Sequence, residues 1–361
     1  MSKSWLRRWQ GPLLWVALAI ILAILPLATQ LDPFWAHIVN EMAIYVILAM
    51  GMNLAMGYGG QINLAMGGLF GVGAYTTAII LLHNGSFPVA FVVSALLGTL
   101  VAALIGLPAL RVRSHYLALV TLGLGIALNI IFTNWEAVTG GAIGLTSIPV
   151  ASIGPLQFDD DTKMSYLFFG IMLATLLIAA VFVHSRFGRN LKGMRDDPIA
   201  ARSMGINVGI YQLTCFAFSG FYAGIAGSLY AVWLSYISPT SFDLNQSIFI
   251  LAQTLVGGMG TLIGPLIGPI LLVGLQQYLL SFGDLQLIIY GALIVVMVLI
   301  ARGGVAGGLI ALWQRLAGRV RRERKGTELA PSVGETNAVA PAAIGGAANG
   351  SPTHEERTGN R

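Results

Sequence analysis

Long apolar runs follow one another along most of this chain, and they restrict its fold more than any other feature. A helix needs about 20 predominantly apolar residues to cross the roughly 30 Å hydrocarbon core of a bilayer. Runs of this kind lie near residues 12–29, 37–56, 62–82, 87–107, 116–134, 165–184, 209–233, 246–261, 264–280 and 286–301. Only 10% of the residues are charged, against about 25% in soluble domains. The sequence therefore predicts an all-α polytopic membrane protein with about ten transmembrane helices.

The basic residues predict how these helices are oriented. With the N-terminus in the cytoplasm and the spans alternating in direction, Lys163 is the single one of the 20 basic residues that falls on the outer side. Lysine and arginine accumulate on the cytoplasmic side of membrane proteins. We therefore expect both termini in the cytoplasm, and we read the net charge of +5 as an orientation signal in a lipid bilayer rather than as a sign of nucleic-acid binding.

Two glycine-rich stretches leave the helix count open by one or two. Residues 57–73 fit either the start of a plain span over 62–82 or a broken helix, because irregular backbone at membrane depth is tolerated inside protein. Residues 246–280, with GGMGTLIGP at their centre, fit one long helix, two helices or a re-entrant pair, since glycine and proline interrupt helices. We prefer two helices there, because a single one would place the arginine-rich segment 315–325 outside.

The composition changes abruptly after Lys325. Residues 326–361 have almost no large apolar groups, so they cannot bury enough surface to offset the entropy lost on ordering. We predict a transmembrane domain over residues 1–325 and a disordered cytoplasmic tail over 326–361. The first apolar run follows three basic residues, as in a signal peptide, but it lacks a clear cleavage site, and we expect a retained helix.

The longest polar segment on the predicted cytoplasmic side runs from residue 186 to residue 207. Asp196 or Asp197 suits the N-cap of a short helix, Pro198 its first position and Gly205 its C-terminal end. The enclosed helix has about seven residues and a length of roughly 10 Å, too short to cross the membrane or to be stable alone. It therefore needs a surface to pack against, unless the segment is an ordinary interfacial loop.

Several motifs resemble those of one transporter family. Ala200, Ala201 and Gly205 have the spacing of the cytoplasmic coupling loop of ABC importer permeases, Glu-Ala-Ala-x-x-x-Gly, with Ile199 in place of the glutamate. The wider run MRDDPIAARSMGINV resembles the branched-chain amino acid permeases of the LivM type. Three more stretches resemble the same family in the same order, from about residue 40 to 302: MNLAMGYGGQINLAMGGLFGVGAYTTA, LRVRSHYLALVTLG with NWEAVTGGAIGLTSIP, and GGMGTLIGPLIGP.

The resemblance implies the permease subunit of an ATP-driven ABC importer that moves branched-chain amino acids into the cytoplasm, as a multi-pass protein of the bacterial inner (cytoplasmic) membrane. It implies as partners a second homologous permease, two cytoplasmic ABC ATPase subunits and a periplasmic solute-binding protein. The chain has no Gly-x4-Gly-Lys-Ser/Thr phosphate loop, so ATP hydrolysis falls to the ATPase subunits. The residues expected to couple to the ATPase are Arg195, Asp196, Asp197, Pro198, Ala200, Ala201 and Gly205.

Other functions stand as alternatives. Members of the same family move urea, short amides or other small solutes. A stand-alone secondary transporter or channel belongs to a different class, but the predicted spans have no central Lys, Arg, Asp or Glu of the kind that ion-coupled transporters keep. An enzyme is not expected, and neither a cofactor nor a metal is predicted, because the histidines and the single cysteine form no catalytic or metal-binding pattern.

Uncharged polar residues within the spans are candidates for a pathway that passes a zwitterion. Gln61 and Asn63 are preferred, because they interrupt the glycine-rich segment. Residues 63–66 read Asn-Leu-Ala-Met where the family often has Ser-Leu-Gly-His. For each polar residue the alternative is an interhelical hydrogen bond. The residues concerned are Asn53, Gln61, Asn63, Asn129, Gln253, Gln276 and Gln277.

Small residues also recur at four-residue spacing. Gly220, Gly224 and Ser228 share one helix face, as do Gly264 and Gly268. Small residues on one face let two helices approach closely. The spacing therefore predicts tight packing, either within the chain or against the partner permease.

Overall fold

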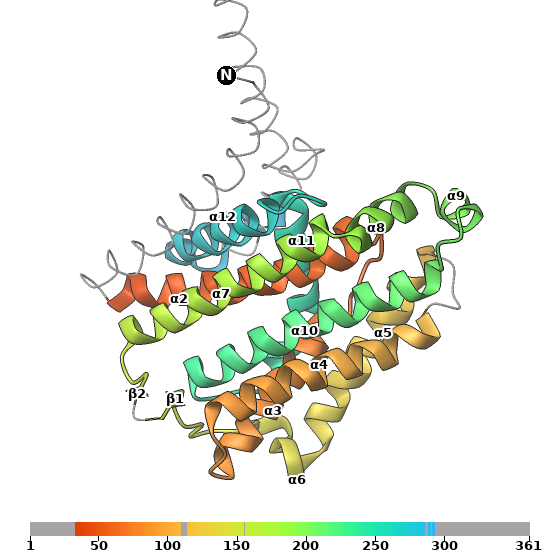
Figure 1. The fold of residues 1–361 in the computed structure, drawn as a ribbon. Helices are drawn as coiled ribbons and strands as arrows, with labels where there is room; N and C mark the ends of the chain where they lie inside the picture. The colour runs from red at the N-terminus through yellow and green to blue at the C-terminus, as the bar shows by residue number, and fades with distance from the viewer. Residues whose placement is uncertain (1–32, 110–113, 155, 286–287, 290, 293–361) are drawn as a thin grey trace, which may run out of the picture. The chain divides into compact units, whose positions relative to one another are not determined.

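The computed structural model describes residues 33–109, 114–154, 156–285, 288–289 and 291–292, all within the first of the chain's two units, Met1–Trp313 (Figure 1). The predicted first span at 12–29 and the predicted tail at 326–361 lie outside these residues. The predicted last span at 286–301 lies almost entirely outside them. The described part consists of helices, their connecting loops and one short pair of strands.

Five helical segments in the described part are long and apolar enough to cross a membrane. They are α2 (Pro33–Met52) with its continuation η2 (Asn53–Tyr58), α4 (Phe87–Ala109), α5 (Ser114–Asn134), α7 (Asp161–His184) and α10 (Val208–Leu234). They correspond closely to the predicted spans at 37–56, 87–107, 116–134, 165–184 and 209–233. A helical protein with several membrane-spanning segments is thereby confirmed, while the total of ten helices and the side of each terminus stay predictions.

Three further apolar helices are shorter: α3 (Met66–Leu82), α11 (Leu244–Gly257) and α12 (Gly264–Leu279). A plain span over 62–82 is wrong at its start, because α2 ends in the π-helical turn η2 and residues 59–65 leave the helix. Residues 246–280 form two helices, as preferred from the sequence. With 14 and 16 residues, α11 and α12 are about 21 and 24 Å long, shorter than the ~30 Å hydrocarbon core.

Short elements connect these helices. The loop after α5 contains α6 (Glu136–Thr139), η3 (Gly141–Ile143) and the antiparallel pair β1 (Ser152–Ile153) and β2 (Leu156–Gln157). The loop after α10 contains η4 (Pro239–Phe242), and η5 (Leu280–Leu285) follows α12. Leu145 and Ile237 form a β-bridge, which joins the loops that follow α5 and α10.

Helices α2 and α10 form the centre of the described bundle. The apolar stretch of α2 is 83% buried and that of α10 is 78% buried, whereas that of α5 is only 17% buried. Helix α10 packs along α4 and α3 (Figure 1). A Cβ atom on Gly224 would overlap the carbonyl oxygen of Ser94, and one on Gly220 would overlap that of Gly98. We call Gly98, Gly220 and Gly224 the glycine seam; here the small-residue spacing serves packing within the chain.

Candidate functional site

The predicted cytoplasmic segment 186–207 contains two helices, α8 (Arg186–Asp196) and α9 (Pro198–Ser203), of which the sequence predicted only the second. Helix α8 begins after its N-cap Ser185, whose Oγ accepts a hydrogen bond from the backbone N–H of Gly188 at 3.2 Å. Its buried residues, Gly188, Leu191 and Met194, recur every three residues. This spacing places them on one helix face, and it is the signal that could have predicted α8.

Helix α9 is the predicted short helix, with six residues. Asp197, rather than Asp196, is its N-cap: Oδ1 of Asp197 accepts hydrogen bonds from the backbone N–H groups of Ile199 at 2.9 Å and Ala200 at 3.1 Å. Gly205 follows the helix with a φ of +79°, the left-handed conformation that commonly ends helices. The residues predicted to begin and end a short helix therefore do so, while their role in coupling stays a prediction.

The outer surface of α9 is largely apolar, with Arg202 and Ser203 exposed beside its apolar side chains. Ile199 is 77% exposed, and Met204, the C-cap residue, is 81% exposed. Pro198 and Ala200 are also exposed, whereas Ala201 is buried. Exposed apolar side chains that gather on one short element mark interaction surfaces more often than scattered ones do. Helix α9 thus presents a small apolar tip with no partner among the described residues.

Arg195, near the end of α8, reaches back to the helix bundle. Its Nη1 atom donates a hydrogen bond to the carbonyl oxygen of Gly57 in η2. Its aliphatic stem lies against Gly60. One turn earlier on α8, Nζ of Lys192 lies 5.2 Å from the centre of the Tyr58 ring, within the range of a cation–π interaction. The structure thus brings the predicted coupling segment against the interrupted end of α2.

Side chains satisfy the irregular backbone between η2 and α3. Asn63 is buried; its Nδ2 donates to Oγ of Ser219 at 2.9 Å, and its Oδ1 accepts from the N–H of Ala65 at 3.1 Å. The N–H of Leu64 donates to Oγ1 of Thr121 at 3.1 Å. Non-helical backbone at membrane depth needs partners of this kind. Both amide atoms of Asn63 are engaged, and its place in a pathway stays a prediction.

Six of the seven polar candidates fall into two groups. Hydrogen bonds to another segment engage Asn53, Asn63, Asn129 and Gln277, as the interhelical alternative expected. Oε1 of Gln61 and both amide atoms of Gln253 are buried and have no hydrogen-bond partner among the described residues. A buried amide without a partner is costly, which makes these two the better candidates for contact with a passing polar solute. The sequence preference missed Gln253.

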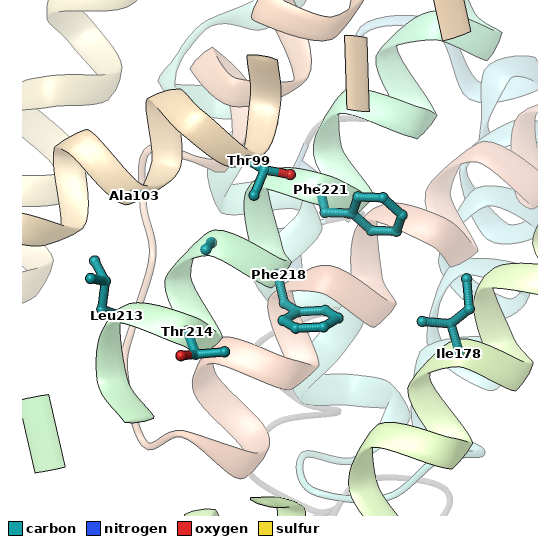
Figure 2. Close-up of a pocket in the computed structure, with 8 residues that line it drawn as sticks. Thr99, Ala103, Ile178, Leu213, Thr214, Phe218 and Phe221 are labelled. Carbon is teal, nitrogen blue, oxygen red and sulfur yellow. The ribbon is translucent and has the colours of Figure 1, made fainter. Parts of the chain in front are cut away.

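A groove between α4, α7 and α10 has a volume of about 420 Å³ and an almost wholly apolar lining. Figure 2 shows Phe218 and Phe221 of α10 and Ile178 of α7 among the lining residues. Thr99 and Thr214 each donate their hydroxyl to the carbonyl four residues earlier, at 2.6 and 2.8 Å. The groove therefore offers no partner to the charged groups of an amino acid, and it is not the candidate pathway.

The described part is thus a helical integral membrane protein in which short non-helical turns join η2 to α3 and α11 to α12, with buried uncharged polar groups beside both turns. Residues 35–299 match the family described as branched-chain amino acid transport system / permease component. The chain belongs to this family. Its predicted location, as a multi-pass protein of the bacterial inner (cytoplasmic) membrane, is confirmed by the family and by the membrane-spanning helices.

The similar proteins are transport permeases. The high-affinity branched-chain amino acid transport system permease protein LivM of Salmonella typhimurium is 34% identical, and LivM of Escherichia coli is 32% identical. Each match covers 71% of this chain and 66% of the relative, so the chain spans just under two thirds of those relatives. The ribose import permease protein RbsC of Escherichia coli is 24% identical over 83% of this chain and 95% of the relative. No solved structure shows significant similarity to the chain.

Proposed function

We propose that this chain is the membrane-spanning permease subunit of an ATP-driven ABC importer that moves branched-chain amino acids into the cytoplasm. The observation that carries the proposal is the 34% and 32% identity to two LivM permeases over the membrane bundle. The ribose permease is less similar, so a sugar or another small solute is the alternative outcome of the test. Gln61, Gln253 and Asn63 are the proposed pathway residues.

The proposed partners are a second homologous permease, two cytoplasmic ABC ATPase subunits that hydrolyse ATP, and a periplasmic solute-binding protein. The exposed apolar tip of α9 supports the ATPase contact, because Ile199 and Met204 need a covering surface. The proposed coupling residues hold or flank this tip: Arg195, Asp196, Asp197, Pro198, Ala200, Ala201 and Gly205.

Uptake by the reconstituted complex tests the function. The full chain is purified together with its proposed permease and ATPase partners, placed in proteoliposomes and supplied with the proposed binding protein. We expect uptake of labelled leucine that requires ATP and is blocked by vanadate. Uptake of ribose or urea in place of leucine would identify that solute as the substrate. Uptake by the chain without the ATPase subunits would instead identify a stand-alone transporter or channel.

Copurification tests the docking surface. Ile199→Asp and Met204→Asp place a charge on the tip, and a charge at the apolar core of an interface disrupts it, so we expect the ATPase subunits to be lost during purification. Ile143→Asp is the matched control, because Ile143 is 76% exposed in η3 at the other end of the bundle. Retention of the ATPase subunits by both tip variants would contradict the assignment.

A further inference from the structure

One buried side chain, that of Asn53, joins η2 to the turn between α11 and α12. Nδ2 of Asn53, in η2, donates to the carbonyl oxygen of Thr261 at 2.8 Å, and Oδ1 of Asn53 accepts from the N–H of Gly260 at 2.8 Å. Thr261 and Gly260 lie in the break between α11 and α12. Because the asparagine is buried and engages both ends of its amide, it fixes the two breaks against each other.

Arg195, from the predicted cytoplasmic segment, contacts the same end of η2. The N–H groups of Gly59 and Gly60 still donate to carbonyls of η2, both at 3.1 Å, but the chain then leaves the helix. The carbonyl of Gly57 is thus one of the last carbonyls of the helix, and these accept no hydrogen bond from within the helix. The guanidinium of Arg195 supplies that donor, and its positive charge is favoured at a helix C-terminus.

Two glycine turns lie against the side chain of Arg195. Gly60 and Gly260 have φ angles of +68° and +72°, which favour glycine. A Cβ atom on Gly60 would lie 3.3 Å from Cγ of Arg195, and one on Gly260 would lie 2.8 Å from its Nη1. Glycine is therefore favoured at both positions by the backbone conformation, and a Cβ atom at either position would press on the arginine side chain.

We propose that Arg195 is a positioning residue that transmits movement of α8 and α9 to a polar node, defined as Asn53, Gly57, Arg195, Gly260 and Thr261. This inference rests on the proposed function, because the movement originates in the ATPase subunits. Both unpaired pathway amides lie close to the node in sequence. Gln61 directly follows Gly60, which lies against Arg195, and Gln253 lies one helical turn before the end of α11. A displacement of the node therefore displaces both amides and opens or closes the inner end of the pathway.

The ratio of solute taken up to ATP hydrolysed tests the proposal in the reconstituted complex. We expect Arg195→Gln to retain ATP hydrolysis while uptake per ATP falls about tenfold, the loss that follows removal of one charge-assisted hydrogen bond. Arg195→Lys recovers part of the ratio, because it keeps the charge but not the planar fork. Arg189→Gln is the control: it removes the same charge from α8, and among the described residues Nη1 of Arg189 donates to the carbonyl of His184, at 3.1 Å, outside the node.

Hydrogen exchange provides a readout that does not depend on transport. In the purified complex without ATP, Arg195→Gln should speed amide exchange in segments 57–62 and 258–261 relative to the wild type and to Arg189→Gln. An unchanged uptake ratio together with unchanged exchange overturns the proposal. If the wild-type complex shows no ATP-driven uptake, the proposed function fails, and the exchange result alone decides whether Arg195 holds the node. If Arg195→Gln lowers the yield of the complex, uptake per ATP and amide exchange are both measured on Arg195→Lys.

Discussion

The glycine seam and the polar node join helices of the same bundle by opposite means. In the seam, Gly220 and Gly224 of α10 lie directly against the backbone of α4, and the methyl group of Ala102 also contacts Gly220. In the node, the side chains of Asn53 and Arg195 join three segments through backbone carbonyl and N–H groups. The seam is backbone against backbone, whereas the node is side chain against backbone.

The difference indicates which parts of the bundle can move. Close-packed interfaces have no space to slide, so a displacement along the seam loses many contacts at once. A hydrogen bond contributes only about 1 kcal/mol net and can exchange for one to water. We therefore regard α3, α4 and α10 as the rigid part, and the inner ends of α2 and α11 as the part that the coupling segment moves.

The largest effect is expected from a side chain in the seam. Gly224→Leu places its Cβ against the carbonyl oxygen of Ser94 and the Cα of Ala95. Overpacking usually costs about 1–3 kcal/mol, and backbone neighbours that cannot rotate away raise this cost. We expect no folded chain in detergent, measured by size-exclusion chromatography of a fluorescent fusion.

Gly170→Leu is the control for this experiment. A Cβ atom on Gly170, in α7, meets no atom of the described structure within 4 Å, so we expect the wild-type yield and melting temperature. A normal elution profile of Gly224→Leu would show that the seam tolerates separation, and the contrast between seam and node would then disappear.

An intermediate effect is expected in the node. Asn53→Leu leaves the N–H of Gly260 and the carbonyl of Thr261 without their partner, at a cost of about 1–3 kcal/mol for a buried polar group. The melting temperature of the complex should fall, and uptake per ATP should fall with it. Asn53→Asp keeps the acceptor for Gly260, but it turns a second oxygen toward the carbonyl of Thr261 at a buried position, so it should lose at least as much. Equal stability of Asn53→Leu and the wild type would show that Asn53 does not stabilise the node.

The sequence predicts the long spanning helices well. Bilayer thickness sets the length of a spanning helix, so apolar runs alone locate α4, α5, α7 and α10. The position of the break before α3 is harder to predict, because the glycines at 57–73 permit many conformations. Hydrogen bonds from Asn63 to Ser219 and from the N–H of Leu64 to Thr121 select one of them, and neither contact has a local signature.

The candidate site divides in the same way. Local rules predict the cap and first position of α9, although Asp196 and Asp197 are equally suitable in sequence and only the geometry distinguishes them. The contact between Arg195 and Gly57 joins residues 138 positions apart, and a single sequence gives no sign of it. Gln253 resembles the other polar residues of the spans, and only its missing hydrogen bonds distinguish it.

A smaller, local effect is expected at α9. Asp197→Ala removes the acceptor for the N–H groups of Ile199 and Ala200, and loss of an N-cap costs about 1 kcal/mol. Because the node does not depend on this cap, amide exchange should rise in residues 198–203 and stay unchanged in 57–62. Asp197→Asn keeps the cap and should behave as the wild type. Faster exchange in both segments of Asp197→Ala would mean that the tip and the node unfold together.

The smallest effect on stability is expected from Gln253→Leu. Replacing a buried amide that has no hydrogen bond with an apolar side chain of similar size should change the free energy of unfolding by less than about 1 kcal/mol. Asn129→Leu is the matched comparison, because it removes a hydrogen bond of 2.7 Å to the carbonyl of Pro239 and should destabilise the chain. If Gln253 contacts the solute, its leucine variant should lower uptake while the melting temperature and ATP hydrolysis remain unchanged. A destabilised Gln253→Leu would instead show that the amide has a structural partner and belongs with Asn53 and Asn129.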